Sequence, residues 1–256
     1  MSLIIYKWLA ATLITLITLI SGFASLHFIR RYQRFLQIGD ALADGIFLGA
    51  AAFHLFPNTL EGLSGHFDLL NTYLIALLFV FCGFLLLYLS ERLLIYHEPE
   101  HKRPVNMSAW MLAGILSIHA FIAGAALGIS DTIASVSILF IAILAHKGFE
   151  SFALALELHR NWHKSYKTKI TLFFFAFVTP LGIVLASMIE RLFTTQTANL
   201  ITCLFSSFAA GSFIYIGTLH MGHDHFHPHM DTSSRYYKML LTIAGMVAMG
   251  VIAIWA

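Results

Sequence analysis

The chain has 256 residues, of which 59% are hydrophobic and only 11% are charged. Soluble domains carry about 25% charged residues, so this composition excludes an ordinary soluble protein. The formal net charge of +2 gives no reason to expect a nucleic-acid partner, and two cysteines, Cys82 and Cys203, are too few for a disulfide framework or a zinc–thiolate cluster.

Apolar stretches of about 20 residues, long enough to cross a bilayer, recur along the whole chain. We predict eight transmembrane helices, near residues 3–27, 41–60, 71–94, 107–130, 133–158, 168–192, 200–221 and 236–256. The first stretch is interpreted as a retained helix rather than a signal peptide, because its apolar part is long and the basic run follows it. The connections are short, so residues 1–256 are expected to form a single transmembrane domain. The predicted fold class is therefore all-α: an integral membrane bundle of eight helices.

Basic residues predict the orientation of this bundle. Twelve of the fifteen Lys and Arg residues follow the first, third, fifth and seventh spans, which places them on one side: Arg30, Arg31, Arg34, Arg92, Lys102, Arg103, Arg160, Lys164, Lys167, Lys169, Arg235 and Lys238. Loops rich in Lys and Arg face the cytoplasm. Both termini are thus predicted on the outer side, and the short loops favour a bacterial inner membrane.

Ionisable residues inside the fourth and fifth spans are the first candidates for function, because such residues are costly in a bilayer. His146 and Glu150 are four residues apart and share one helix face. A very short outer loop makes the two spans antiparallel neighbours, which brings His119 to the same depth. Two imidazoles and a carboxylate suit a borderline divalent ion such as zinc. Glu157 continues the face toward the inner end. The alternative is a hydrogen-bonded polar cluster that only holds the helices together.

Lys147 stands beside these candidate ligands, where a cation would repel a metal ion. Three interpretations stay open. The side chain faces elsewhere, since adjacent residues point about 100° apart. It pairs with Glu91 or Glu150. Or burial lowers its pKa until it is neutral.

Two further groups of polar residues indicate a path for a cation. On the second span an arc of about 100° carries Asp40, Asp44, His54, Asn58 and Glu61, as a water-lined face would. Interfacial positions are an equally open interpretation for Asp40, Asp44 and Glu91. Between the last two spans lies a histidine-rich loop, whose composition is typical of metal binding: His220, His223, His225, His227 and His229.

The sequence resembles the ZIP family of metal transporters (Zrt/Irt-like proteins) along essentially its whole length. The similar segments are FLGAAAFHLFPN at 47–58, the leucine-rich third span ending at Glu91, HAFIAGAALG at 119–128, HKGFE at 146–150 and GSFIYIGTLH at 211–220. The resemblance implies eight spans with both termini outside. It also implies import of a divalent transition metal, zinc first, as the transported substrate rather than a cofactor, and no enzymatic activity.

The resemblance also implies roles for individual residues. His54 and Asn58 would meet the metal at the outer mouth, and His119, His146 and Glu150 would hold it at the midplane. Glu157 and the histidine-rich loop would receive it inside, and Glu91 or water would fill a vacant ligand position. Ala120, Ala123 and Lys147 stand where the family usually has Asn or Ser, Glu and an acid, so only one ion site is implied. The resemblance further implies that one helix bundle slides against another and so exposes the ion site alternately to the two sides of the membrane.

Two other functions stay open. An intramembrane zinc hydrolase would use the same three ligands with Ser151 nearby, although the chain has no HExxH or GxSxG motif. A sensor would bind metal without transporting it. The sequence also leaves open whether Gly124 and Gly128 pack against another helix of this chain or against a second copy in a homodimer.

Overall fold

The computed structural model describes residues 2–31, 33–96, 107–162, 165–189, 195–220 and 232–254. These ranges contain helices joined by short turns and no strand: α1 (Leu3–Arg31), α2 (Gln33–Ala50), η1 (Ala51–Leu55), α3 (Phe56–Ser64), α4 (Leu69–Tyr96), α5 (Met107–Ile129), α6 (Ile133–Asn161), α7 (Ser165–Ile189), α8 (Thr195–Tyr215), η3 (Ile216–His220) and α9 (Thr232–Ala253). The π-helical turns η1 and η3 continue the helices that precede them. The prediction of an all-helical chain is confirmed.

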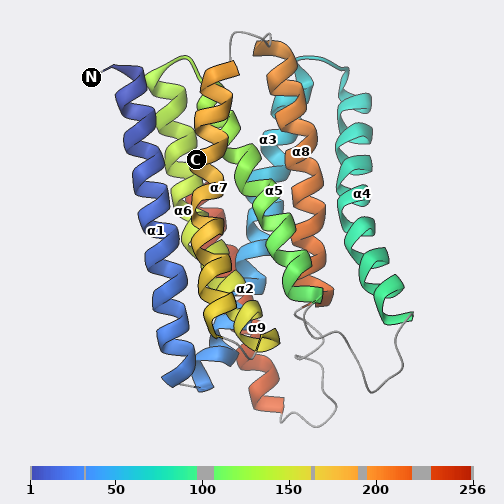
Figure 1. The fold of residues 1–256 in the computed structure, drawn as a ribbon. Helices are drawn as coiled ribbons and strands as arrows, with labels where there is room; N and C mark the ends of the chain where they lie inside the picture. The colour runs from blue at the N-terminus through green and yellow to red at the C-terminus, as the bar shows by residue number, and fades with distance from the viewer. Residues whose placement is uncertain are drawn as a thin grey trace.

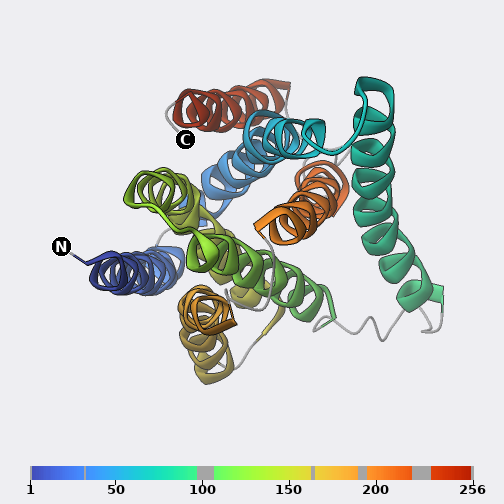
Figure 2. The ribbon, with the colours of Figure 1, turned by 90° about the horizontal axis from the view of Figure 1, so that it is seen from above.

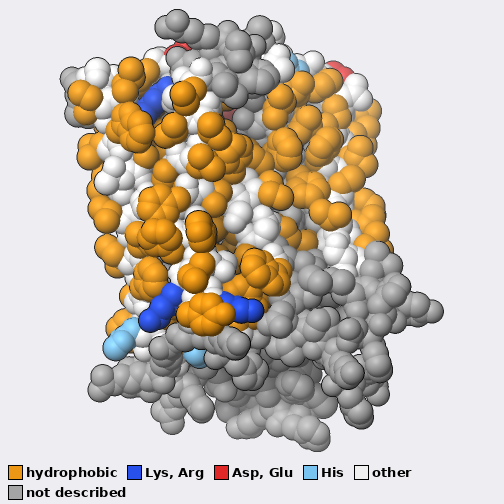
Figure 3. Space-filling view, viewed as in Figure 1, with side chains coloured by type: hydrophobic (Ala, Val, Ile, Leu, Met, Phe, Trp, Pro, Cys, Tyr) orange, Lys and Arg blue, Asp and Glu red, His pale blue; other side chains and the backbone are white. Residues whose placement is uncertain are grey.

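Eight helical segments are long and apolar enough to cross a membrane, and each overlaps one predicted span: Leu3–Ile29, Ile38–Ser64, Leu69–Ser90, Leu112–Ile129, Ile133–His159, Tyr166–Met188, Leu200–Thr218 and Tyr236–Ala253. On the face that Figure 3 shows, apolar side chains cover most of the described surface, and basic and histidine side chains lie near its upper and lower ends. In a soluble protein so continuous an apolar surface would aggregate. It fits the hydrocarbon core of a bilayer instead.

The helices form two groups that pack against each other. One group contains α1, α5, α6 and α7, with α5 packed most extensively on α7 and α1 on α6. The other contains α2, α3, α4, α8 and α9. Figure 2 shows the first group at the lower left and the second around the upper right, with α5 beside α8 in the middle. The two groups meet mainly where α5 contacts α8 and where α2 contacts α6.

Glycine lets helices within each group approach closely. A Cβ atom at Gly124 of α5 would collide with the carbonyl oxygen of Thr179, and one at Gly182 of α7 would collide with that of Phe121. Either contact would force the two backbones apart. Similar contacts join α4 to α8 and α2 to α9, at Gly83, Gly211, Gly45 and Gly245. The Gly124 contact is therefore internal to the chain and gives no support for a homodimer.

The second membrane segment changes its winding at η1, between α2 and α3. Pro57 in the first turn of α3 has no N–H to donate to the carbonyl group four residues earlier. In the wider turn the N–H of Phe56 donates to the carbonyl oxygen of Ala51, five residues earlier. His54 lies inside this turn, and π turns occur frequently at functional sites. By contrast, α7 continues through Pro180.

Candidate metal-binding site

The connection between α5 and α6 sets the position of the candidate ligands. It spans only residues 130–132, and Thr132 caps α6 by accepting a hydrogen bond from the N–H of Ser135 at 3.1 Å. Such a short turn makes α5 and α6 contacting neighbours (Figure 1). His119 lies near the middle of α5, and His146 lies near the middle of α6. The two histidines therefore face each other at similar depth, as the sequence indicates.

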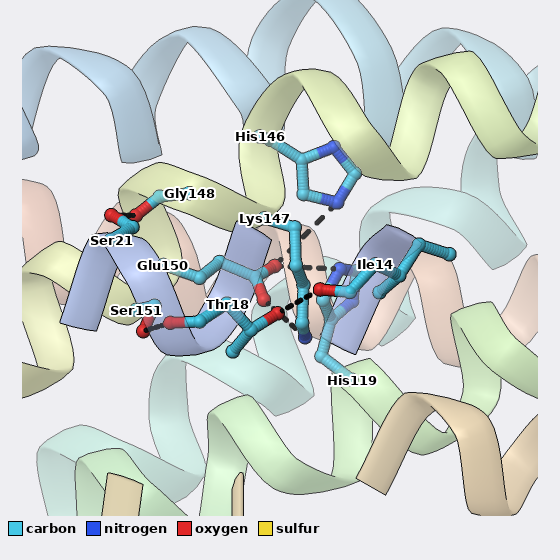
Figure 4. Close-up of polar contacts among 9 residues, drawn as sticks. All are labelled: Ile14, Thr18, Ser21, His119, His146, Lys147, Gly148, Glu150 and Ser151. Atoms are coloured by element: carbon cyan, nitrogen blue, oxygen red, sulfur yellow. Dashed lines mark hydrogen bonds and ion pairs between the residues drawn. The ribbon is translucent and has the colours of Figure 1, made fainter. Parts of the chain in front are cut away.

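Three ionisable side chains converge between these helices (Figure 4). The Nε2 atom of His119 lies 3.3 Å, and that of His146 3.6 Å, from the same oxygen of Glu150, Oε1. One ligand atom from each residue lies within 4.8 Å of the others. All three residues are buried, with exposed fractions of 7%, 4% and 2%. A single cation placed among them could contact two nitrogens and one oxygen.

Polar atoms of this group lack hydrogen-bond partners. Among the described residues, His119 Nε2, His146 Nδ1 and Glu150 Oε1 are buried without a hydrogen bond. The 3.3 Å approach of His119 to Glu150 is an ion-pair distance without hydrogen-bond geometry. Buried polar atoms are nearly always paired, and an exception calls for an explanation such as an ion. The two imidazoles and the carboxylate are also a donor set that zinc accepts.

His54 brings the second helix group to this site. Its half-buried ring has its centroid 5.6 Å from that of His146, and the His119 and His146 centroids are 5.8 Å apart. Asn58 is exposed one turn farther along, with its Nδ2 atom 3.3 Å from Nδ1 of His54. His54 thus lies beside the other two histidines, closer than a separate position at an outer mouth would place it. No sequence signal fixes this proximity, because it depends on how α2 docks against α6.

Lys147 pairs with Glu150, which selects one of the interpretations left open by the sequence. Its Nζ atom lies 2.8 Å from Oε2 of Glu150 and 4.4 Å from the centroid of the Phe175 ring. The side chain is 1% exposed. Glu91 belongs to α4, but its side chain lies outside the described part of the chain.

The remaining candidate residues lie away from the three-residue group or outside the description. Glu157 is buried on α6, seven residues or about 10 Å beyond Glu150 along the helix axis. Asp40 and Asp44 are buried on α2 rather than exposed at an interface. The side chain of His220, the last residue of η3, is not described, and His223 and His225 fall outside the described residues.

Comparisons with known proteins add independent findings. The family model described as "ZIP Zinc transporter" matches residues 4–105 and 96–253. Zinc transporter 11 of Arabidopsis thaliana is 26% identical over 284 residues, covering 99% of this chain and 86% of the relative. Zinc transporter ZIP1 of Danio rerio is 25% identical over 276 residues, covering 90% and 87%.

A third relative is similar over a shorter region. Zinc transporter 7 of Arabidopsis thaliana is 28% identical over 144 residues, which cover 54% of this chain and 40% of the relative. The chain thus spans most of two of these relatives and less than half of the third.

Proposed function

We propose that this chain, which belongs to the family of ZIP zinc transporters, moves zinc or a similar divalent cation across a membrane through the site of His119, His146 and Glu150. One observation carries this proposal: three buried ligand-type side chains with unpaired polar atoms converge inside an apolar bundle. Polar clusters that only join helices satisfy their hydrogen bonds. This one leaves a buried nitrogen or oxygen of each of the three residues without a hydrogen bond.

The resemblance to ZIP transporters supports transport toward the cytoplasm, and the charge distribution supports an orientation of the chain. By the positive-inside rule, the basic loops would lie in the cytoplasm and both termini outside. With this orientation the cation would enter near Asn58, pass His54, bind at the bilayer midplane and leave past Glu157 toward the histidine-rich loop. The chain would act as one transmembrane domain. The printed relatives are eukaryotic, so they lend no support to a bacterial inner membrane as the host membrane.

The two helix groups suggest how access alternates. His119, His146 and Glu150 belong to α5 and α6 in one group, whereas His54 belongs to the other. At several glycines, pairs of helices within each group approach closely. Sliding of one group against the other would therefore separate His54 from the three ligands without breaking the ligand set. The site would then lose access to water at one end of the path and gain access at the other end.

Ser151 is a poor nucleophile for the alternative function, an intramembrane hydrolase. The residue is fully buried, and its hydroxyl donates a hydrogen bond of 2.7 Å to the carbonyl oxygen of Thr18 on α1. A hydrolytic serine needs a neighbouring base and access to its substrate. The sensor alternative uses the same ligands as a transporter, so only a flux measurement separates the two.

The test is zinc flux into liposomes that contain the purified protein and an entrapped fluorescent indicator. We expect saturable flux from the unmodified chain and none from the His146→Ala, Glu150→Ala double variant. His27→Ala is the matched control, because His27 is an exposed histidine near the end of α1. Folded protein that binds zinc but shows no flux would favour the sensor and contradict the transporter.

A further inference from the structure

Lys147 is among the largest fully buried side chains of the described structure. Burying an ammonium group inside a membrane protein is costly unless a counter-charge compensates for it. Its counter-charge here is Glu150, three residues later on the same helix face. The aromatic face of Phe175 lies on another side of the ammonium group, at 4.4 Å from the ring centroid.

The ion pair divides the two oxygens of Glu150 between different partners. Oε2 accepts the hydrogen bond from Lys147 at 2.8 Å, whereas Oε1 faces Nε2 of both histidines. Figure 4 shows dashed lines from the Glu150 carboxylate to His119, to His146 and to the ammonium end of Lys147. A carboxylate with one oxygen held in this way offers a cation one oxygen rather than two.

This division determines which atoms a bound cation contacts. With Oε2 reserved, the site supplies two imidazole nitrogens and one carboxylate oxygen. Imidazole suits zinc, whereas carboxylate oxygen suits manganese. The ammonium charge also repels any divalent cation by an amount that depends little on the element. Holding back one oxygen therefore penalises oxygen-preferring ions more than zinc.

We propose that Lys147 is a specificity-determining residue, which reserves one oxygen of Glu150 and so keeps the site rich in nitrogen and selective for zinc over manganese. The proposal rests on the proposed function only in that the cation binds at His119, His146 and Glu150. It assigns Lys147 a role without making it a metal ligand. A purely structural lysine would affect stability and leave the preference among ions unchanged.

The test compares Zn²⁺ and Mn²⁺ dissociation constants of the purified full chain with those of Lys147→Met. Methionine keeps the length and apolar stem of the side chain but removes the charge and the donor. We expect tighter binding of both ions, with a gain for Mn²⁺ about tenfold larger than for Zn²⁺ because the second oxygen is freed. Lys7→Met is the matched control. Lys7 is also buried, but its Nζ donates to the carbonyl oxygen of Gly128 at 2.6 Å, nine residues from His119.

Each outcome bears on the proposal. A Zn²⁺/Mn²⁺ preference that falls in Lys147→Met but not in Lys7→Met supports it. An unchanged preference, including equally weakened binding of both ions, overturns the role of Lys147 in specificity. It does not contradict metal binding at the proposed transport site. Absence of metal binding by the unmodified chain would overturn the proposed function as well. If Lys147→Met does not fold, Lys147→Gln, which retains a polar group, is measured in the same way.

Discussion

Ser151 of α6 donates its hydroxyl to the carbonyl oxygen of Thr18 in α1, immediately after the candidate ligand Glu150. In the other direction, the hydroxyl of Ser21 in α1 donates a hydrogen bond to the carbonyl oxygen of Gly148 in α6 at 2.5 Å. The two hydrogen bonds run in opposite directions and enclose the helical turn that carries Glu150. They hold that turn against α1.

We expect Ser151→Ala and Ser21→Ala each to lower the free energy of unfolding by about 0.6 kcal/mol, a typical value for hydrogen bonds between membrane helices. Both should also raise the KM for zinc, because the carboxylate loses its fixed position. The double variant should lose less free energy of unfolding than the sum of the two single losses, because both hydrogen bonds hold the same turn. Thermal unfolding and liposome flux measure these effects. Ser25→Ala is the control, because the Ser25 hydroxyl donates within α1, to the carbonyl oxygen of Ser21. A KM unchanged in the double variant would contradict the positioning role.

Removing Glu150 should affect stability and transport separately. Glu150→Ala leaves Lys147 without its ion-pair partner, and breaking a buried pair in this way costs about 3–5 kcal/mol. Adding Lys147→Met should recover most of that stability but none of the zinc flux. Melting temperature and flux, measured on the same preparations, distinguish the two effects. Recovery of flux by the second substitution would exclude Glu150 as a ligand.

Glycine substitutions test how closely α5 and α7 pack against each other. Gly124→Ala should destabilise the protein by about 1–3 kcal/mol, because the new methyl group meets the backbone carbonyl of Thr179. Gly114→Ala on the same helix is the control, since nothing lies within 4 Å of its added Cβ. That substitution should leave the melting temperature unchanged or raise it, because alanine favours helix more than glycine. Equal melting temperatures for the two variants would show that the helices do not approach so closely.

His54 should contribute more to zinc movement than to zinc binding. It lies beside His146 but belongs to the other helix group. We therefore expect His54→Ala to reduce the maximal flux several-fold while the dissociation constant for zinc changes little. Asn58→Ala should have a smaller effect in the same direction, because the Asn58 side chain contacts the imidazole of His54 and lies farther from the three ligands. A large loss of affinity in His54→Ala would instead make His54 a ligand of the resting site.

The convergence of His119, His146 and Glu150 could be predicted from the sequence because it depends on local rules. Helical periodicity places His146 and Glu150 on one face, and the short turn after α5 sets the depth of His119. The sequence alone does not identify the partner of Lys147, because it does not fix the direction of this side chain, and both Glu91 and Glu150 were candidates. The position of His54 depends on packing between segments about ninety residues apart, which neither periodicity nor loop length determines.

Helix ends were the least predictable part of the fold. The second span continues to Ser64, beyond the predicted end near residue 60, because the π turn at Ala51–Leu55 accommodates Pro57 without ending the helix.

The ion pair between Lys147 and Glu150 gives the resting site no net charge when its imidazoles are neutral. A divalent ion therefore brings both of its charges uncompensated into the bilayer, and the loaded site carries two elementary charges. A membrane potential acts on each charge with about 2.3 kcal/mol per 100 mV. For two charges this amounts to about 4.6 kcal/mol per 100 mV. A site whose own charges cancel would thus respond to the membrane potential only when a cation is bound, and the empty site would move at no electrical cost.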